Sequence, residues 1–235
     1  DTGIFYTDVN NYDIYINGVY TQSTNRVITS IYGLLPDTDY NIEVVESAQA
    51  GDASTRNEAN KGSLSVHTDF EYVTLNVRDF GAYGNGEHDD TLAIQTAIMA
   101  CPENARVYVP AGTYKITTLF LKSNLVLDLA KDAVLSAFTE RERFGILPGM
   151  IQSYDEKDEY NLGSWEGNPL DCFTGIITGI NVENVVITGE GTIDGCASFD
   201  NWWKDAKIRK IAWRPRLVFI SHCKNVLLHG VTVTN

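Results

Sequence analysis

The first seventy residues alternate between apolar and polar positions in short runs that turn residues separate. Residues 12–18 alternate and end in Asn-Gly, a pair that tolerates the positive φ angles of a hairpin turn. Similar short runs follow at residues 26–31, 41–45 and 62–68. The pattern therefore predicts an all-β domain of four or five strands over residues 1–70.

A second domain is predicted over residues 71–235, because strand patterns there combine with a helix. Residues 73–81 form a strand pattern that ends in a glycine-rich turn, and residues 92–100 have the pattern of an amphipathic helix. Asp89 and Asp90 precede this helix, where carboxylates accept hydrogen bonds from free amides. Four apolar residues are expected on its buried face: Leu92, Ile94, Ala97 and Ile98.

Beyond the helix, an asparagine followed by an apolar strand occurs three times, in residues 123–129, 183–189 and 224–230. Asn184 and Asn225 are too far apart for a hairpin repeat, and the distance suits one coil of a solenoid with an inserted loop. Stacked short strands with asparagine at their turns predict a right-handed parallel β-helix. The helix at residues 92–100 would cover its open N-terminal end.

The net charge of −13 argues against a nucleic-acid partner, because phosphate binding requires a basic surface. The sequence contains no apolar run of about eighteen residues, so no membrane-spanning helix is predicted. It begins at Asp1 without a leader, and we expect that a targeting segment or other residues have been removed. The oligomeric state is left open.

One stretch of this acidic chain is basic. Six of the 18 basic residues lie between positions 204 and 216: Lys204, Lys207, Arg209, Lys210, Arg214 and Arg216. Only Asp205 opposes them, and three tryptophans bracket them: Trp202, Trp203 and Trp213. Arginine can bind a carboxylate through two hydrogen bonds, and aromatic faces stack on sugar rings. We therefore predict that substrate binds at Lys207, Arg209, Lys210 and Arg214. The alternative is a solvated loop that the tryptophans attach to the solenoid.

The four cysteines include no CxxC pair, which argues against zinc and thioredoxin-type sites: Cys101, Cys172, Cys196 and Cys223. Three disulfide connectivities are possible, and buried free thiols that pack as small apolar groups are the default expectation. No metal and no organic cofactor are predicted.

The spacing Leu34-x-Pro36-x-Thr38-x-Tyr40 resembles the corner of fibronectin type III domains, in which the tyrosine hydroxyl bonds back to the chain. Such sandwiches contain about seven strands, so residues 1–70 are expected to lack strands at their N-terminal side. His67, in the last predicted strand, is expected to face solvent.

Three segments resemble pectin-degrading β-helix proteins. The first, Phe80-Gly-Ala-x-Gly-x-Gly86 with residues 109–114, is also typical of lyases and phage tailspikes. The second, Gly189-x-Gly-Thr-Ile-Asp-Gly195 followed by Trp202-Trp203, is similar to glycoside hydrolase family 28, the polygalacturonases. Arg214-Pro215 and residues 219–235 continue that pattern in the same order. A fibronectin-like module before the β-helix further resembles the exo-acting bacterial branch of this family.

The resemblance implies inverting hydrolysis of α-1,4-galacturonosidic bonds in polygalacturonate, outside the cytoplasm, in a secreted or periplasmic protein. The family's carboxylates come from an Asn-Thr-Asp segment and an Asp-Asp pair on later rungs, followed by Gly-His-Gly and Arg-x-Lys. Residues 1–235 do not supply these motifs, and Asp89-Asp90 is interpreted as a helix cap. No catalytic residue is assigned; we expect those residues beyond Asn235 and expect this chain alone to be inactive.

Other candidate residues have structural interpretations. Asp194 lies in a tight turn where its side chain can bond the local backbone, and His222 and His229 flank a predicted strand. His88 is a turn residue beside the capping acids, and the acidic loop at 154–169 could form one wall of a cleft.

Two other functions remain open. A polysaccharide lyase on the same scaffold would use calcium to hold substrate carboxylates, and a chelator would abolish its activity. A non-catalytic carbohydrate-binding or adhesin-type β-helix would lack converging carboxylates. An open solenoid end at Asn235 would expose apolar rung surface and favour self-association.

Overall fold

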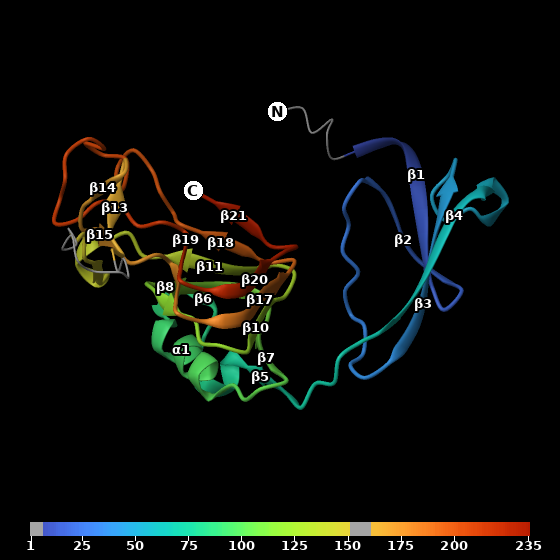
Figure 1. Cartoon of the computed structure of the whole chain (residues 1–235), viewed down its shortest axis with the longest axis horizontal. Coiled ribbons are helices and arrows are strands. Elements are labelled where there is room, and N and C mark those ends of the chain that lie inside the picture. Colours follow the sequence, from blue (N-terminus) through green and yellow to red (C-terminus); the bar gives the residue numbers. More distant parts are fainter. Residues whose placement is uncertain (1–6, 151–160) are drawn as a thin grey trace, which may run out of the picture. The chain divides into compact units, whose positions relative to one another are not determined.

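The computed structural model describes residues 7–150 and 161–235, and the chain divides into two compact units, 1–71 and 72–235. Figure 1 shows that strands dominate both units and that the helix α1 (Thr91–Ala100) belongs to the second. The sequence pattern places the boundary after residue 70. No helix among the described residues is long and apolar enough to cross a membrane.

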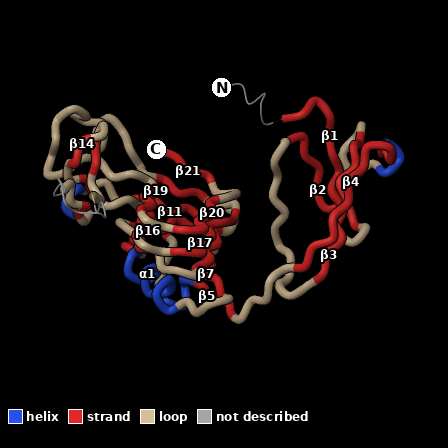
Figure 2. The backbone as a smooth tube through the Cα atoms, in the orientation of Figure 1, coloured by secondary structure: helices blue, strands red, loops and turns tan. Residues whose placement is uncertain are grey.

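The first unit contains one antiparallel sheet in the order β2-β1-β3-β4 (Figure 2). Asn17 and Gly18 connect the first two strands with φ angles of 51° and 79°, so the predicted Asn-Gly hairpin is confirmed. The strands are β1 (Thr7–Ile16), β2 (Val19–Arg26), β3 (Asp39–Ser47) and β4 (Arg56–His67).

The strand predicted at residues 26–31 is absent, because β2 ends at Arg26 and the next residues pair with no strand. Val27 and Ile28 are 66% and 78% exposed, so their apolar side chains do not gain the burial that stabilises a strand. Among described residues 7–71 there is one sheet, and a second layer of a sandwich is not formed. The predicted corner is present, since Leu35 N donates to Tyr40 Oη at 2.8 Å.

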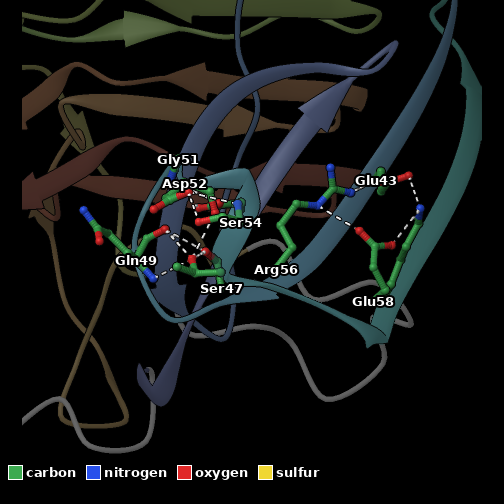
Figure 3. Close-up of polar contacts among 11 residues, drawn as sticks. Glu43, Ser47, Gln49, Gly51, Asp52, Ser54, Arg56 and Glu58 are labelled. Atoms are coloured by element: carbon green, nitrogen blue, oxygen red, sulfur yellow. Dashed lines mark hydrogen bonds and ion pairs between the residues drawn. The ribbon is translucent and has the colours of Figure 1, made fainter.

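Side-chain hydrogen bonds shape the connection from β3 to β4 (Figure 3). Ser47 Oγ donates to Gln49 O at 2.7 Å, and the Asp52 carboxylate accepts from Ser54 N at 2.9 Å. Asp52 thereby caps the 3-10 helix η2 (Ala53–Thr55). Arg56 follows at the start of β4 and pairs with Glu58 at 3.1 Å and with Glu43. This connection is therefore held by polar contacts rather than by apolar packing.

The second unit is a parallel β-helix built from three sheets, as predicted. The sheet named here after β10 has the order β20-β17-β10-β7-β5, with bounds β5 (Val73–Asn76), β7 (Ala105–Val109), β10 (Leu125–Leu129), β17 (Glu183–Gly189) and β20 (Lys224–Leu228). The β11 sheet has the order β21-β18-β11-β8-β6, with bounds β6 (Asn85–Asp89), β8 (Gly112–Ile116), β11 (Ala133–Ala137), β18 (Thr192–Asp194) and β21 (Thr232–Thr234). The β16 sheet contains β9 (Leu119–Phe120), β16 (Ile177–Ile180) and β19 (Val218–Ser221).

The core lies inside the coil, because alternate residues of each strand point inward. Leu125, Leu127 and Leu129 of β10 are fully buried, and Leu125 aligns with Val185 in the next rung. Val185 in turn aligns with Val226. The three segments that share the asparagine-strand pattern therefore occupy equivalent positions in the solenoid, as expected for stacked coils.

The helix α1 (Thr91–Ala100) covers the N-terminal end of the β-helix. Gln95 Nε2 donates to Phe120 O at 2.9 Å and Gln95 Oε1 accepts from Phe120 N at 2.7 Å, which pairs the backbone of edge strand β9. Ile94, Ala97 and Ile98 are fully buried as predicted, whereas Leu92 is 78% exposed. The prediction that Leu92 lies on the buried face was wrong, because a residue two positions before Ile94 lies on the opposite side of the helix.

The two acids before α1 have separate structural roles. Asp89 Oδ1 accepts from Thr91 N at 3.1 Å, which is a cap of the kind predicted. Asp90 occupies the N-cap position but its side chain makes no capping hydrogen bond, so the capping role predicted for it was wrong. Its carboxylate instead accepts from Tyr83 N at 2.7 Å and Gly84 N at 3.0 Å. Asp90 therefore organises the glycine-rich turn. The predicted strand at 73–81 stops at Asn76, where the 3-10 helix η3 (Val77–Phe80) leads into the same turn.

Candidate substrate-binding site

Two long loops leave the β-helix at equivalent points in consecutive rungs. Residues 138–176 connect β11 to β16, and residues 195–217 connect β18 to β19. Both therefore start at the end of the β11 sheet and return at the β16 sheet, which brings them side by side. In the described part of the first loop, residues 138–150 and 161–176, there are four short strands and one 3-10 helix: η4 (Arg141–Arg143), β12 (Ile146–Leu147), β13 (Ser164–Trp165), β14 (Asn168–Pro169) and β15 (Cys172–Phe173).

Aromatic packing joins these two loops. Trp202 is 3% exposed, and its ring meets Phe144 and Phe173 edge-on at centroid distances of 5.6 and 5.8 Å. Trp165 of the first loop stacks on Trp213 of the second, with centroids 4.8 Å apart and an interplanar angle of 6°. These contacts support the structural interpretation for Trp202 and Trp213. The loop predicted at 154–169 lies partly outside the described residues.

Arg214 lies between two aromatic rings. Its guanidinium carbon is 4.9 Å from the Trp165 centroid and 4.4 Å from the Trp203 centroid, and Nη1 donates to Ala206 O at 2.8 Å. Burial lowers the pKa of Arg214, and the nearby Arg141 cation lowers it further. The aromatic faces fix the position of this cation at favourable cation–π distances.

A pocket of about 80 Å³ opens beside Arg214. Its lining residues belong to the second loop, except Ile176 at the end of the first loop and Asn235 after β21; they are Ile176, Gly195, Ala197, Trp202, Trp203, Arg214, Pro215, Arg216, Leu217 and Asn235. Trp203 is 47% exposed, so part of its ring is free to contact a ligand. Arg216 Nη2 donates to Ser164 O at 2.6 Å, which holds its guanidinium at the pocket. The pocket thus combines an aromatic face with two cations, a combination suited to an acidic sugar.

The carboxylate of Asp194, which precedes the pocket residue Gly195, has a structural role. Asp194 Oδ1 accepts from Cys196 N at 2.8 Å and from Asn235 Nδ2 at 3.0 Å. The first of these bonds is the local backbone contact predicted for Asp194. Because this oxygen already accepts two hydrogen bonds, the geometry gives no reason to assign Asp194 as a catalytic acid.

The structure places only one of the four predicted binding residues at the pocket. Arg214 lines the pocket described above, while Lys207, Arg209 and Lys210 do not. Lys207 is exposed, Arg209 lies 3.5 Å from Asp171, and Lys210 pairs with Asp205 at 2.8 Å. Binding of substrate by these four residues stays a prediction, and the geometry favours Arg214 among them.

The pocket residues that were not predicted to bind substrate include Trp203, Arg216 and Asn235. Trp203 and Arg216 belong to the stretch that the sequence singled out, so the signal for them was present. Asn235 lines the pocket because it follows β21, the strand that aligns with β18 through Asp194 and Thr234. Only the register of the rungs could have indicated that position.

The histidines near the other candidate positions have local partners. His88 Nδ1 lies 3.2 Å from Asp90 Oδ1, and its ring lies against that of Tyr83 with centroids 4.2 Å apart and a tilt of 33°. His222 Nδ1 lies 2.8 Å from Ser221 Oγ, and His229 Nδ1 lies 3.5 Å from Thr188 Oγ1. Within residues 7–150 and 161–235, no group of three or more His, Cys, Asp or Glu side chains is placed to hold a metal ion.

All four cysteines are free thiols. Cys101 and Cys172 are buried as expected, whereas Cys196 and Cys223 are only partly buried. The Cys196 Sγ lies 3.2 Å from Ser136 Oγ, so this thiol takes part in a polar contact instead of apolar packing.

Residues 74–128 match the family described as rhamnogalacturonase A/epimerase, pectate lyase-like. The chain is 32% identical over 184 residues to an exo-poly-alpha-D-galacturonosidase of Dickeya chrysanthemi, covering 74% of this chain and 27% of that protein. It is 27% identical over 193 residues to a probable polygalacturonase of Vitis vinifera, covering 77% of this chain and 37% of that protein. The chain therefore spans about a quarter to a third of the length of these relatives.

Among solved structures, the fold is similar to that of a family 28 exopolygalacturonase from Yersinia enterocolitica. The TM-score is 0.62 at 22% sequence identity, and the similarity covers 97% of this chain and 50% of that one. At this level of identity the likeness supports the parallel β-helix fold.

Proposed function

Since the chain is a relative of the polygalacturonases of glycoside hydrolase family 28, we propose that the protein containing it hydrolyses α-1,4-galacturonosidic bonds in polygalacturonate. The observation that carries this proposal is the similarity to an exo-poly-alpha-D-galacturonosidase over 184 residues. The pocket at Trp203, Arg214 and Arg216 supports it, because it offers an aromatic face and two cations to an acidic sugar.

The proposed chemistry needs one carboxylic acid that protonates the leaving oxygen and a carboxylate that activates water on the opposite face. In inverting enzymes these groups are about 6.5–9.5 Å apart, which leaves space for the water. We assign neither role to residues 1–235 and propose that they belong to further residues of the same protein. The part of the polygalacturonase described here would form the N-terminal rungs and one pocket of the binding surface.

We further propose that the protein is secreted or periplasmic, because polygalacturonate is too large to reach an enzyme in the cytoplasm. Its first unit is proposed to be a fibronectin type III-like module. The hydrogen bond from Leu35 N to Tyr40 Oη supports this assignment, since it is the bond typical of the tyrosine corner.

The test is release of reducing sugar from polygalacturonate by the 235-residue chain and by the same protein extended to the length of its relatives. We expect activity only in the extended protein. Proton NMR of the first product should show the β-anomer, because inverting hydrolysis of an α-linkage produces that configuration. Galactan, which has no carboxylates, is the control substrate and should not be cleaved.

Three results would contradict the proposal. Unsaturated products that absorb ultraviolet light and disappear with a chelator would indicate a lyase. Binding of polygalacturonate without cleavage by either protein would indicate a carbohydrate-binding β-helix. Cleavage by the 235-residue chain itself would require its own acid and base, and Asp194 would then be the first candidate to replace.

A further inference from the structure

A second, smaller pocket lies next to the one that Trp203 and Arg216 line, and it contains an unusual concentration of positive charge. Its volume is about 10 Å³. Four cations contribute to its lining, namely Arg141, Lys204, Lys210 and Arg214, together with one acid, Asp205. Arg141 comes from the first loop and the other cations from the second, so the pocket exists only because the two loops are packed together.

The positive charge in this pocket is only partly neutralised. Asp205 already pairs with Lys210 at 2.8 Å. Arg141 forms no ion pair among the described residues, and its Nη2 donates to the neutral carbonyl of Asn201 at 3.3 Å. Arg214 likewise donates to the carbonyl of Ala206. Two guanidinium groups that repel each other in a partly desolvated place are stabilised when an anion binds between them.

An unused hydrogen-bond donor adds a second, independent observation. The Nε1 atom of Trp213 is buried and has no hydrogen-bond partner among the described residues, and Trp213 lines this same pocket. A buried donor without an acceptor costs about 1–3 kcal/mol, and native proteins usually avoid this cost. An anionic oxygen in the pocket would supply the acceptor.

The size of the pocket limits what can enter. A volume of about 10 Å³ corresponds to roughly one water-sized group, so a carboxylate oxygen fits and a sugar ring does not. The ring must then lie outside, and the adjacent larger pocket offers a place for it. Trp202 and Arg214 line both pockets, so the two pockets are adjacent at these side chains.

We propose that the smaller pocket is a subsite for the carboxylate of a galacturonate residue, held by Arg141, Arg214 and the Trp213 N–H group. This inference rests on the proposed function and adds a selectivity to it. An unesterified galacturonate presents a charged oxygen to the pocket. A methyl ester has no charge and an additional carbon atom, so it binds less well at this position.

Calorimetric titration of the 235-residue chain with trigalacturonate tests the subsite. We expect Arg141→Gln to weaken binding by about tenfold, the effect of losing one hydrogen bond to a charged group. Trp213→Phe keeps the stacked ring and removes only the donor, and a few-fold loss is expected. Arg141→Lys keeps the charge and should bind with intermediate affinity.

Lys131→Gln is the matched control, because it removes one positive charge from the second unit at an exposed residue that lines neither pocket and was not predicted to bind substrate. Its affinity should equal that of the unmodified chain. The trimethyl ester should bind the unmodified chain and Arg141→Gln equally weakly, which separates loss of the subsite from general unfolding. Acetate at millimolar concentration should not compete.

Equal affinities for the unmodified chain and Arg141→Gln would overturn the subsite while leaving the proposed function intact. Equal losses in Arg141→Gln and Lys131→Gln would also overturn it, since the effect would then reflect net charge alone. Competition by acetate would indicate a general carboxylate pocket. If the unmodified chain does not bind trigalacturonate at all, the subsite is overturned, and release of reducing sugar by the extended protein then tests the proposed function separately.

Discussion

At the scale of single residues, three asparagines fix the same turn in successive rungs. Asn124, Asn184 and Asn225 have φ angles of 55°, 56° and 52°, a left-handed conformation that asparagine tolerates better than most residues. Asn184 Nδ2 donates to Asn124 Oδ1, and Asn225 Nδ2 donates to Asn184 Oδ1, each at 2.9 Å. The middle asparagine therefore has both a backbone role and a side-chain role.

Substitution of Asn184 separates these two roles. Asn184→Gly keeps the left-handed turn and loses the hydrogen bonds, and we expect a loss of about 1 kcal/mol in the free energy of unfolding. Asn184→Ala adds the cost of the left-handed conformation, for a total of about 2 kcal/mol. Urea denaturation of the two variants measures the difference. Alanine and glycine variants of equal stability would show that the backbone conformation contributes nothing.

His67 makes the first unit sensitive to pH. Its Nδ1 lies 2.8 Å from Asp39 Oδ1 and its Nε2 lies 3.1 Å from Asp37 Oδ1, although the side chain is half-exposed, as expected for a solvent-facing residue. The hydrogen bond with Asp39, followed by the one with Asp37, raises the pKa of His67 above its usual value of 6.5. The protonated form is therefore favoured in the folded state.

The sign of the pH effect follows from that shift. A raised folded-state pKa gives a stabilisation that is complete below about pH 6.5 and disappears as the pH rises through the folded-state value. The unmodified chain should thus lose more thermal stability between pH 5.5 and pH 8.5 than His67→Gln does. NMR titration of the His67 ring protons gives the pKa directly. A value at or below 6.5 would refute the expected shift.

At the scale of elements, the two long loops depend on one buried tryptophan. Trp202 packs between Phe144 and Phe173, and Arg141 lies 4.7 Å above its ring. Its neighbour Trp203 is 47% exposed, and the Arg214 guanidinium carbon lies 4.4 Å from its ring centroid. Adjacent tryptophans in the sequence therefore have different functions: one anchors the loop and the other faces the pocket.

We expect Trp202→Ala to destabilise the second unit by about 3–5 kcal/mol, the usual cost of removing a buried aromatic side chain. Trp203→Ala should cost less than about 1 kcal/mol, because it removes one exposed cation–π contact. Binding should separate the two variants differently. Trp203→Ala should weaken the affinity for trigalacturonate directly, without unfolding the loop. Differential scanning calorimetry and titration calorimetry provide the two measurements, and similar stabilities for both variants would contradict the assignment.

At the scale of the whole molecule, the two units have separate hydrophobic cores. The main cluster of buried apolar residues is drawn from the second unit, from Val77 to Ala212. Ile14, Tyr15 and Val45 of the first unit are buried outside that cluster. Separate cores allow separate unfolding transitions.

We therefore expect two transitions in a calorimetric scan of the chain. His67→Gln should change the pH dependence of one transition, and Asn184→Ala should lower the temperature of the other. A single transition that both substitutions shift would show that the two units unfold as one cooperative body.

The sequence predicted much of this architecture because its turns and strands carry local signals. The Asn-Gly hairpin and the corner at Tyr40 depend on residues that are close in the chain, and both are present. The run at 26–31 shows the limit of such signals. Its apolar residues fit a strand, yet a strand also requires a neighbour to pair with, and none of the described strands lies beside it.

The sequence alone determined the coil of the second unit. Inward positions of a stacked rung must be apolar and its tight turns require residues that tolerate positive φ, so the repeated asparagine-strand pattern specifies the solenoid. Only the tertiary structure decided which charged residues meet. Arg141 and Arg214 come from different loops, and they line one pocket because aromatic packing holds those loops together. Such a contact depends on the packing of distant segments, which no local pattern along the chain encodes.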